Sequence, residues 1–239
     1  MENLIVETKL TRKSRLETFK RALTFLNHIL ISFTFLYTVW ICWKNGFEKI
    51  FTWHVILCVF GFNVLITESI LLFDGGNTWT QALTQPQRKT AHWILQTVGS
   101  ICVIVGVALE FYWRGVLNKS HFCKTHSILE LIAVILMILS MSNGLGALYA
   151  VELRRKIKPV YIKVVHAIAG LVCFVLGMIS LWYGYKKRIF QENSIPELLV
   201  ALQISTLLII VLSVGGAVET VIIRIHTIFQ VFNCRRQTR

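Results

Sequence analysis

Four histidines stand near the starts of four successive apolar segments of this 239-residue chain. They are His54, His92, His126 and His166. Imidazole nitrogens are ligands of transition metals and of haem iron, and ionisable residues inside apolar segments are usually functional. His28 and His226 lack this shared placement, and we interpret them as packing or interface residues. His121 falls between two segments, where surface exposure and a role in a surface site are equally consistent with its position.

The four histidines form two pairs at two depths if the segments are antiparallel helices. Successive antiparallel helices start on alternate sides, so His54 and His126 share one side, and His92 and His166 share the other. Two imidazoles facing each other across a bundle fill both axial positions of a b-type haem, which suits outer-sphere electron transfer. No CxxCH motif is present, so ligation and packing would hold each haem. Ligands one turn inside the hydrocarbon core would place the two irons roughly 15–20 Å apart.

The elements that position these histidines are predicted to be transmembrane helices. Hydrophobic residues make up 55% of the chain, charged residues only 15%, and the mean hydropathy is +0.63. A helix needs about 20 apolar residues to span a bilayer, and lipid leaves the backbone no other bonding partners. We therefore expect an all-α integral membrane protein with six transmembrane helices, the second to fifth forming a four-helix bundle around two haems. The apolar runs are 22–43, 50–73, 91–109, 127–151, 164–185 and 198–223.

Charge predicts the orientation of the chain. Most of its 25 lysines and arginines fall in the two tails and in the second and fourth connections, and by the positive-inside rule these face the cytosol. The predicted organisation is a basic cytosolic tail (1–21), a transmembrane domain (22–223) and a second basic cytosolic tail (224–239). The net charge of +13 thus reflects topology and contact with membrane lipid, and no nucleic-acid partner is expected. About twenty polar residues precede the first apolar run, so we expect a retained anchor and not a cleaved signal.

Two other classes of function stay open. Glu130 follows His126 by four residues, hence on the same helical face, and this pair could bind a divalent metal in a non-haem metal or proton transporter. Transporters, however, tend to gather polar residues near the membrane midplane on broken helices, whereas these histidines are split towards the two faces. The other alternative is a haem-binding anchor subunit of a quinol-linked complex.

The segments around the histidines resemble the cytochrome b561 family, and in particular its small animal members that consist of a bare six-helix unit. The resemblance extends over residues from about 25 to 225. It is carried by residues 53–54, 89–96, 125–127 and 166–177. Val55 departs from the proline that many members have after the first ligand, and Glu130 replaces a usual glycine. Gly170, four residues after His166, fits a position where a glycine lets a porphyrin lie close to the helix.

The resemblance implies two haem b groups, with axial ligand pairs His54/His126 and His92/His166. It also implies a homodimer that acts as an ascorbate-dependent transmembrane oxidoreductase. Cytosolic ascorbate would be the donor, and monodehydroascorbate or ferric iron the acceptor on the other side. We expect a multi-pass protein of an intracellular membrane, such as the endoplasmic reticulum or a vesicle.

Candidate substrate-binding residues are cations near the ligands on each side. Ascorbate is an anion, so cationic hydrogen-bond donors beside the cytosolic pair are the natural binding groups. On that side we single out Arg88, Lys89 and Lys163. On the opposite side, the candidates for the acceptor are His121, Lys119 and Lys124.

Overall fold

The computed structural model describes residues 2–77, 79–155 and 157–237, with side chains outside 2–13, 227 and 230–237. The described residues are helical or in connections, without strands. The helices are α1 (Glu2–Asn45), α2 (Ile50–Val59), η1 (Phe60–Ile66), α3 (Thr67–Leu71), α4 (Gln85–Val116), α5 (Thr125–Leu148), η2 (Glu152–Arg155), α6 (Pro159–Gly184), α7 (Arg188–Asn193) and α8 (Pro196–Gln237). Several predicted cations have side chains outside the described set: Lys9, Arg12, Lys13, Lys156, Arg235, Arg236 and Arg239.

Six helical segments are long and apolar enough to cross a membrane, which confirms the predicted fold class. They are Ser14–Asn45, Ile50–Leu71, Gln85–Val116, Thr125–Leu148, Pro159–Gly184 and Pro196–His226. Most of these helices are longer than the apolar runs, because backbone hydrogen bonding continues into polar flanks that hydropathy does not count. For the same reason, most of the predicted basic tails continue α1 and α8 as helix.

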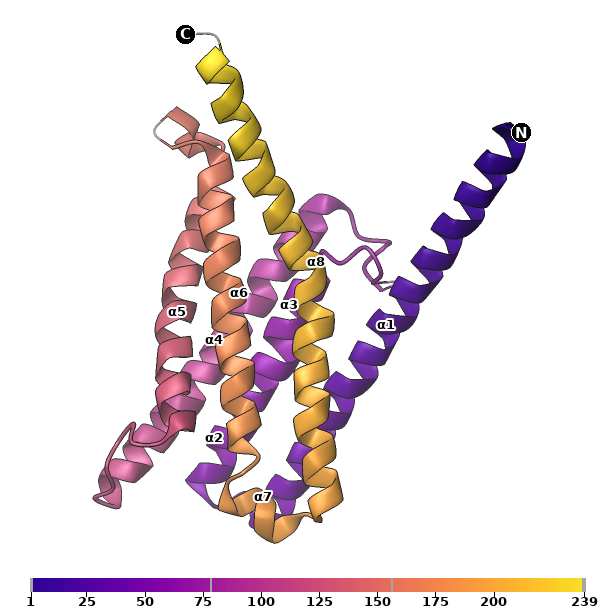
Figure 1. Ribbon diagram of the computed structural model, residues 1–239. Helices are drawn as coiled ribbons and strands as arrows, with labels where there is room; N and C mark the ends of the chain where they lie inside the picture. Colours follow the sequence, from indigo (N-terminus) through magenta and orange to yellow (C-terminus); the bar gives the residue numbers. More distant parts are fainter. Residues whose placement is uncertain (1, 78, 156, 238–239) are drawn as a thin grey trace.

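The start of α1 and the end of α8 lie at the same end of the bundle (Figure 1). We call this the terminal end, and the end that carries α7 the opposite end. The helix starts follow local sequence signals. Thr84 accepts a hydrogen bond from the backbone of Gln87, whose side chain bonds back to Thr84, while Pro159 and Pro196 occupy first helical positions.

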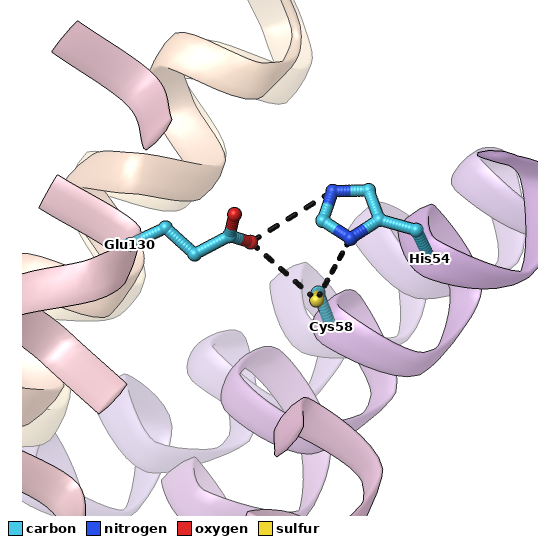
Figure 2. A group of neighbouring side chains, drawn as sticks. All are labelled: His54, Cys58 and Glu130. Atoms are coloured by element: carbon cyan, nitrogen blue, oxygen red, sulfur yellow. Dashed lines mark hydrogen bonds and ion pairs between the residues drawn. The ribbon is translucent and has the colours of Figure 1, made fainter. Parts of the chain in front are cut away.

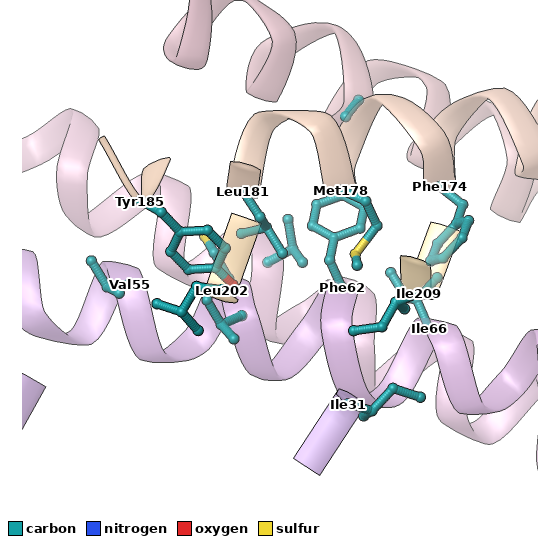
Figure 3. Close-up of a cluster of buried hydrophobic side chains, with 14 of the residues drawn as sticks. Ile31, Val55, Phe62, Ile66, Phe174, Met178, Leu181, Tyr185, Leu202 and Ile209 are labelled. Atoms are coloured by element: carbon teal, nitrogen blue, oxygen red, sulfur yellow. The ribbon is translucent and has the colours of Figure 1, made fainter. Parts of the chain in front are cut away.

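The second span packs against α6 and α8 through a buried apolar cluster (Figure 3). Phe62 and Met178 face each other there, at 2% and 0% exposure. Gly177 makes this contact possible, since a Cβ at that position would overlap the Phe62 ring. The cluster fixes the second span relative to α6, and these two elements carry one histidine of each predicted pair.

A π-helix, η1, interrupts the second span, and hydropathy had not revealed it. Its Asn63 is fully buried and donates from Nδ2 to the carbonyl of Ile31, 3.1 Å away on α1. A π turn holds one residue more than an α turn, so it changes which residues of α3 face α4. On the N-terminal side of η1, the His54 side chain contacts Gly106 of α4. On its C-terminal side, the carbonyl of Ser69 contacts His92 of α4. Insertions of this kind occur frequently at functional sites.

Candidate functional site

The structure brings the four histidines together in the two pairs that topology suggested. At the opposite end, His54 of α2 faces His126 of α5, with ring centroids 6.2 Å apart and planes at 79°. At the terminal end, His92 of α4 faces His166 of α6, again at 6.2 Å and with planes at 87°. Two metal–nitrogen bonds of about 2 Å each, together with the distance from each nitrogen to its ring centre, add up to about 6 Å. Each pair is therefore spaced to hold one metal ion between its rings.

Each of the four imidazoles is held by a backbone carbonyl at Nδ1. The distances are 3.0 Å from His54 to Gly106, 2.9 Å from His92 to Ser69, 2.8 Å from His126 to Ser180 and 3.0 Å from His166 to Ser140. A carbonyl oxygen only accepts, so Nδ1 must carry the hydrogen and Nε2 keeps its lone pair. Metal-ligating histidines are oriented by such bonds. The arrangement thus fits four neutral Nε2 ligands.

Glycines leave room beside two of the rings. A Cβ at Gly184 would lie 3.4 Å from Cε1 of His126, and a Cβ at Gly144 would lie 3.2 Å from Cε1 of His166. The predicted glycine, Gly170, has a different close neighbour: a Cβ there would lie 3.2 Å from Oγ of Ser140. Gly170 therefore lets α6 pack closely against Ser140 of α5, the residue whose carbonyl contacts His166.

Glu130 lies beside His54, a contact that the i, i+4 argument for His126 had not anticipated. Its Oε1 is 3.8 Å from Nε2 of His54 and 3.6 Å from Sγ of Cys58, and all three side chains are buried (Figure 2). Cys58 was missed by the sequence analysis, although its i+4 spacing from His54 could have suggested a shared face. A nitrogen, a sulfur and an oxygen within 4.8 Å of one another form a possible metal-binding group.

A cationic cavity of about 300 Å³ opens at the opposite end and reaches His54 and His126. The three predicted residues His121, Lys119 and Lys124 all line it, and the His121 ring stacks on Phe111 with centroids 4.1 Å apart. Further charged residues that the sequence did not single out as ligands also line it. They are Glu110, Arg114, Lys187 and Arg188. This cavity can bind an anion.

Lys187 is the cation whose environment departs most clearly from that of a surface lysine. Partial burial lowers the pKa of its ammonium, and the positive charges of Arg114 and Lys124 lower it further. Neighbouring cations repel one another unless an anion sits between them. A bound anion would relieve the repulsion from Arg114 and Lys124, part of which the carboxylates of Glu110 and Glu130 already offset.

The predicted cations at the terminal end surround the starts of α4 and α6. Arg88 is half-buried and donates from Nε to the carbonyl of Leu83, 3.2 Å away, whereas Lys89 is exposed. Lys163 is half-buried one turn before His166, and its carbonyl accepts from Nη1 of Arg224 on α8 at 3.4 Å. Arg224 had been assigned to the basic tail, and only the fold brings it to this end of α6.

The sequence matches a family described as eukaryotic cytochrome b561 over residues 53–191, a range that contains all four histidines. The transmembrane reductases CYB561D2 of Mus musculus and Homo sapiens are each 32% identical over 137 residues, or 57% of this chain and 61% of theirs. The plasma membrane ascorbate-dependent reductase CYBRD1 of Mus musculus is 25% identical over 146 residues, covering 61% of this chain and 49% of that protein. The matched region thus spans less than two thirds of the length of each of these three relatives.

Proposed function

Because this chain belongs to the eukaryotic cytochrome b561 family, we propose that it transfers electrons across a membrane through two haem b groups. One group would be bound by His92 and His166 and the other by His54 and His126. The observation that carries the proposal is the set of four Nδ1–carbonyl hydrogen bonds, which leave four Nε2 atoms available in two facing pairs.

The residues of this chain supply orientation, insulation and charge. A haem held between the two imidazoles of a pair would supply a one-electron carrier. The backbone carbonyls hold each imidazole in one tautomer, and the His54 side chain is buried at 3% exposure. The two histidine pairs lie at the two ends of the bundle. A single electron-transfer step between them would therefore carry an electron across the membrane.

The proposed donor is ascorbate, bound at the terminal end, which we assign to the cytosol from the distribution of basic residues. Arg88, Lys89 and Lys163 remain the proposed binding residues, and Arg224 joins them because it contacts the backbone of Lys163. The naming of one relative as an ascorbate-dependent reductase supports this choice.

The proposed acceptor is an anion, either monodehydroascorbate or a ferric chelate, bound in the cationic cavity at the opposite end. The lining by Lys119, His121, Lys124 and Lys187 supports an anionic acceptor, since these groups would offer charge-assisted hydrogen bonds. A homodimer in an intracellular membrane remains part of the proposal. It rests on the family resemblance alone.

One observation favours a second candidate, a non-haem metal transporter. His54, Cys58 and Glu130 form a buried group with the ligand types that bind zinc. Against it, a group of this kind lies at only one end of the bundle among the described residues.

An absorption spectrum separates the two candidates. The protein purified from haem-replete cells should show six-coordinate haem b, two per chain by pyridine haemochrome assay, and should be reduced by ascorbate. The metal content of the same sample is measured in parallel. A colourless preparation that carries stoichiometric zinc would overturn the proposal in favour of the transporter.

A further inference from the structure

An ionisable pair near the terminal end has no part in the proposed function so far. Nδ1 of His28, on α1, lies 2.8 Å from Oε1 of Glu68, on α3, and the two side chains are 19% and 31% exposed. From its position in the sequence alone, His28 is interpreted as a packing or interface residue. An intramembrane histidine paired with a carboxylate is instead a candidate for handling protons.

The second ring nitrogen of His28 is open to protonation. A carboxylate oxygen accepts from Nδ1–H, so a neutral His28 keeps its lone pair on Nε2. That Nε2 atom is buried and has no hydrogen-bond partner among the described residues. A proton added there would create an imidazolium that is ion-paired with Glu68.

A second carboxylate, nearer the surface, adds its negative charge to that of Glu68. Asp74, in the connection after α3, is half-exposed and accepts from Thr24 Oγ1 at 3.1 Å and from the Gly76 backbone at 3.2 Å. Glu68 and Asp74 are the ionisable groups of the described residues whose charges act on His28. The residue before His28, Asn27, donates a neutral hydrogen bond to Ser213 on α8. Both charges therefore favour a proton on His28.

The pair is one residue away from the support of a proposed haem ligand. Ser69, which follows Glu68, accepts from Nδ1 of His92 with its carbonyl and from Nε2 of Gln96 with its hydroxyl. Successive Cα atoms are 3.8 Å apart, so the Cα of Glu68 lies within about 10 Å of the His92 ring. In a medium of low dielectric constant, a negative charge added at the His92–His166 site would raise the proton affinity of a titratable group nearby.

We propose that the His28–Glu68 pair takes up one proton when an electron arrives at the His92–His166 site and releases it when the electron moves on. This inference rests on the proposed function. The charges balance: ascorbate monoanion loses one electron to the site and one proton on becoming monodehydroascorbate, and Nε2 of His28 gains one proton from the terminal-end face. Glu68 and Asp74 act as positioning residues that hold the proton near the electron.

The midpoint potential of the terminal-end haem tests the proposal. Proton uptake linked to reduction makes the potential fall as pH rises, by up to tenfold in the equilibrium constant per pH unit, or about 59 mV for a one-electron couple. Potentials are titrated with dithionite and mediators between about pH 5 and pH 8, where histidine changes charge. The haem is assigned by its absence in His92→Ala.

His28→Gln and Glu68→Gln should flatten this slope, each by removing one side of the pair. His226→Gln, a substitution of an exposed histidine on α8, should retain it. A haem-free wild type would sink the proposed function. A wild-type potential independent of pH, or a slope that survives both substitutions, would overturn this inference alone. If one variant loses its haem, the other decides, and loss of haem in both would show that the pair is only structural.

Discussion

Nδ1 of His126 lies 2.8 Å from the backbone carbonyl of Ser180, across the interface between α5 and α6. The Ser180 hydroxyl in turn donates to the carbonyl of His126 at 3.0 Å. The ring therefore cannot turn without breaking a contact with α6. The hydrogen bond from Nδ1 to a backbone carbonyl recurs, with other partners, at His54, His92 and His166. The predictions below follow from these bonds and from the charges around the two pairs.

Substitution of the histidines should remove the two haems separately. His92→Ala and His166→Ala should each abolish the same haem, because each removes one of two facing ligands, and His54→Ala and His126→Ala should abolish the other. The reduced spectrum should lose about half of its haem absorbance in each case. His226→Ala is the control and should keep both haems. If His54→Ala and His92→Ala removed the same signal, the pairing would be wrong.

Lys89→Ala should slow reduction by ascorbate at the terminal end. A charge-assisted hydrogen bond contributes about 1.5–3 kcal/mol, so the apparent affinity for ascorbate should fall about tenfold or more. Stopped-flow reduction across ascorbate concentrations measures this, and reduction by dithionite should not change. Lys186 lies at the other end over the ring of Trp182, so Lys186→Ala is the matched control. An unchanged rate in both Lys89→Ala and Arg88→Ala would leave these cations as topological anchors.

Oxidation by an anionic acceptor should depend on the charge of Lys187. Its pKa is lowered by burial and by Arg114 and Lys124, so it loses its proton at a lower pH than an exposed lysine, whose pKa is about 10.4. The positive charge is present below the lowered pKa and lost above it. The rate at which ferric citrate oxidises the pre-reduced protein should therefore decline as pH rises through that value.

The matched control for this pH dependence is Lys187→Arg. Arginine stays protonated throughout, so the decline should move to higher pH. Lys187→Ala should be slow at every pH. Coincident pH profiles of the wild type and Lys187→Arg would show that the acceptor does not contact Lys187.

Gly144→Ala should disturb the terminal-end site without touching a ligand. The added Cβ would lie 3.2 Å from Cε1 of His166, so the ring or α5 must shift by a few tenths of an ångström. We expect an altered electron paramagnetic resonance signal from the terminal-end haem and a normal one from the other. Gly215→Ala is the control, since a Cβ there would meet nothing within 4 Å. If the terminal-end signal were the same in Gly144→Ala and Gly215→Ala, the His166 ring would have room to accommodate the added methyl group.

The sequence by itself determined the six helices and the two depths of the histidines. The reason is physical: spanning a bilayer requires long apolar helices, and short connections force them to alternate in direction. That alternation places His54 and His126 at one end and His92 and His166 at the other, whereas the packing of the helices makes the rings of each pair face each other. The four carbonyl partners could not be predicted, because every residue has a backbone carbonyl and only packing selects which one meets a ring.

Tertiary structure alone decided the contacts between helices distant in the chain. Glu130 of α5 lies near His54 of α2 because the two side chains point toward each other across the bundle. His28 of α1 contacts Glu68 at the start of α3, directly after η1, which packs against α1. Arg224 reaches Lys163 because α8 runs beside α6. Hydropathy indicates which segments of the chain lie in apolar surroundings. It does not record the rotation of one helix against another, and that rotation decides which polar side chains meet.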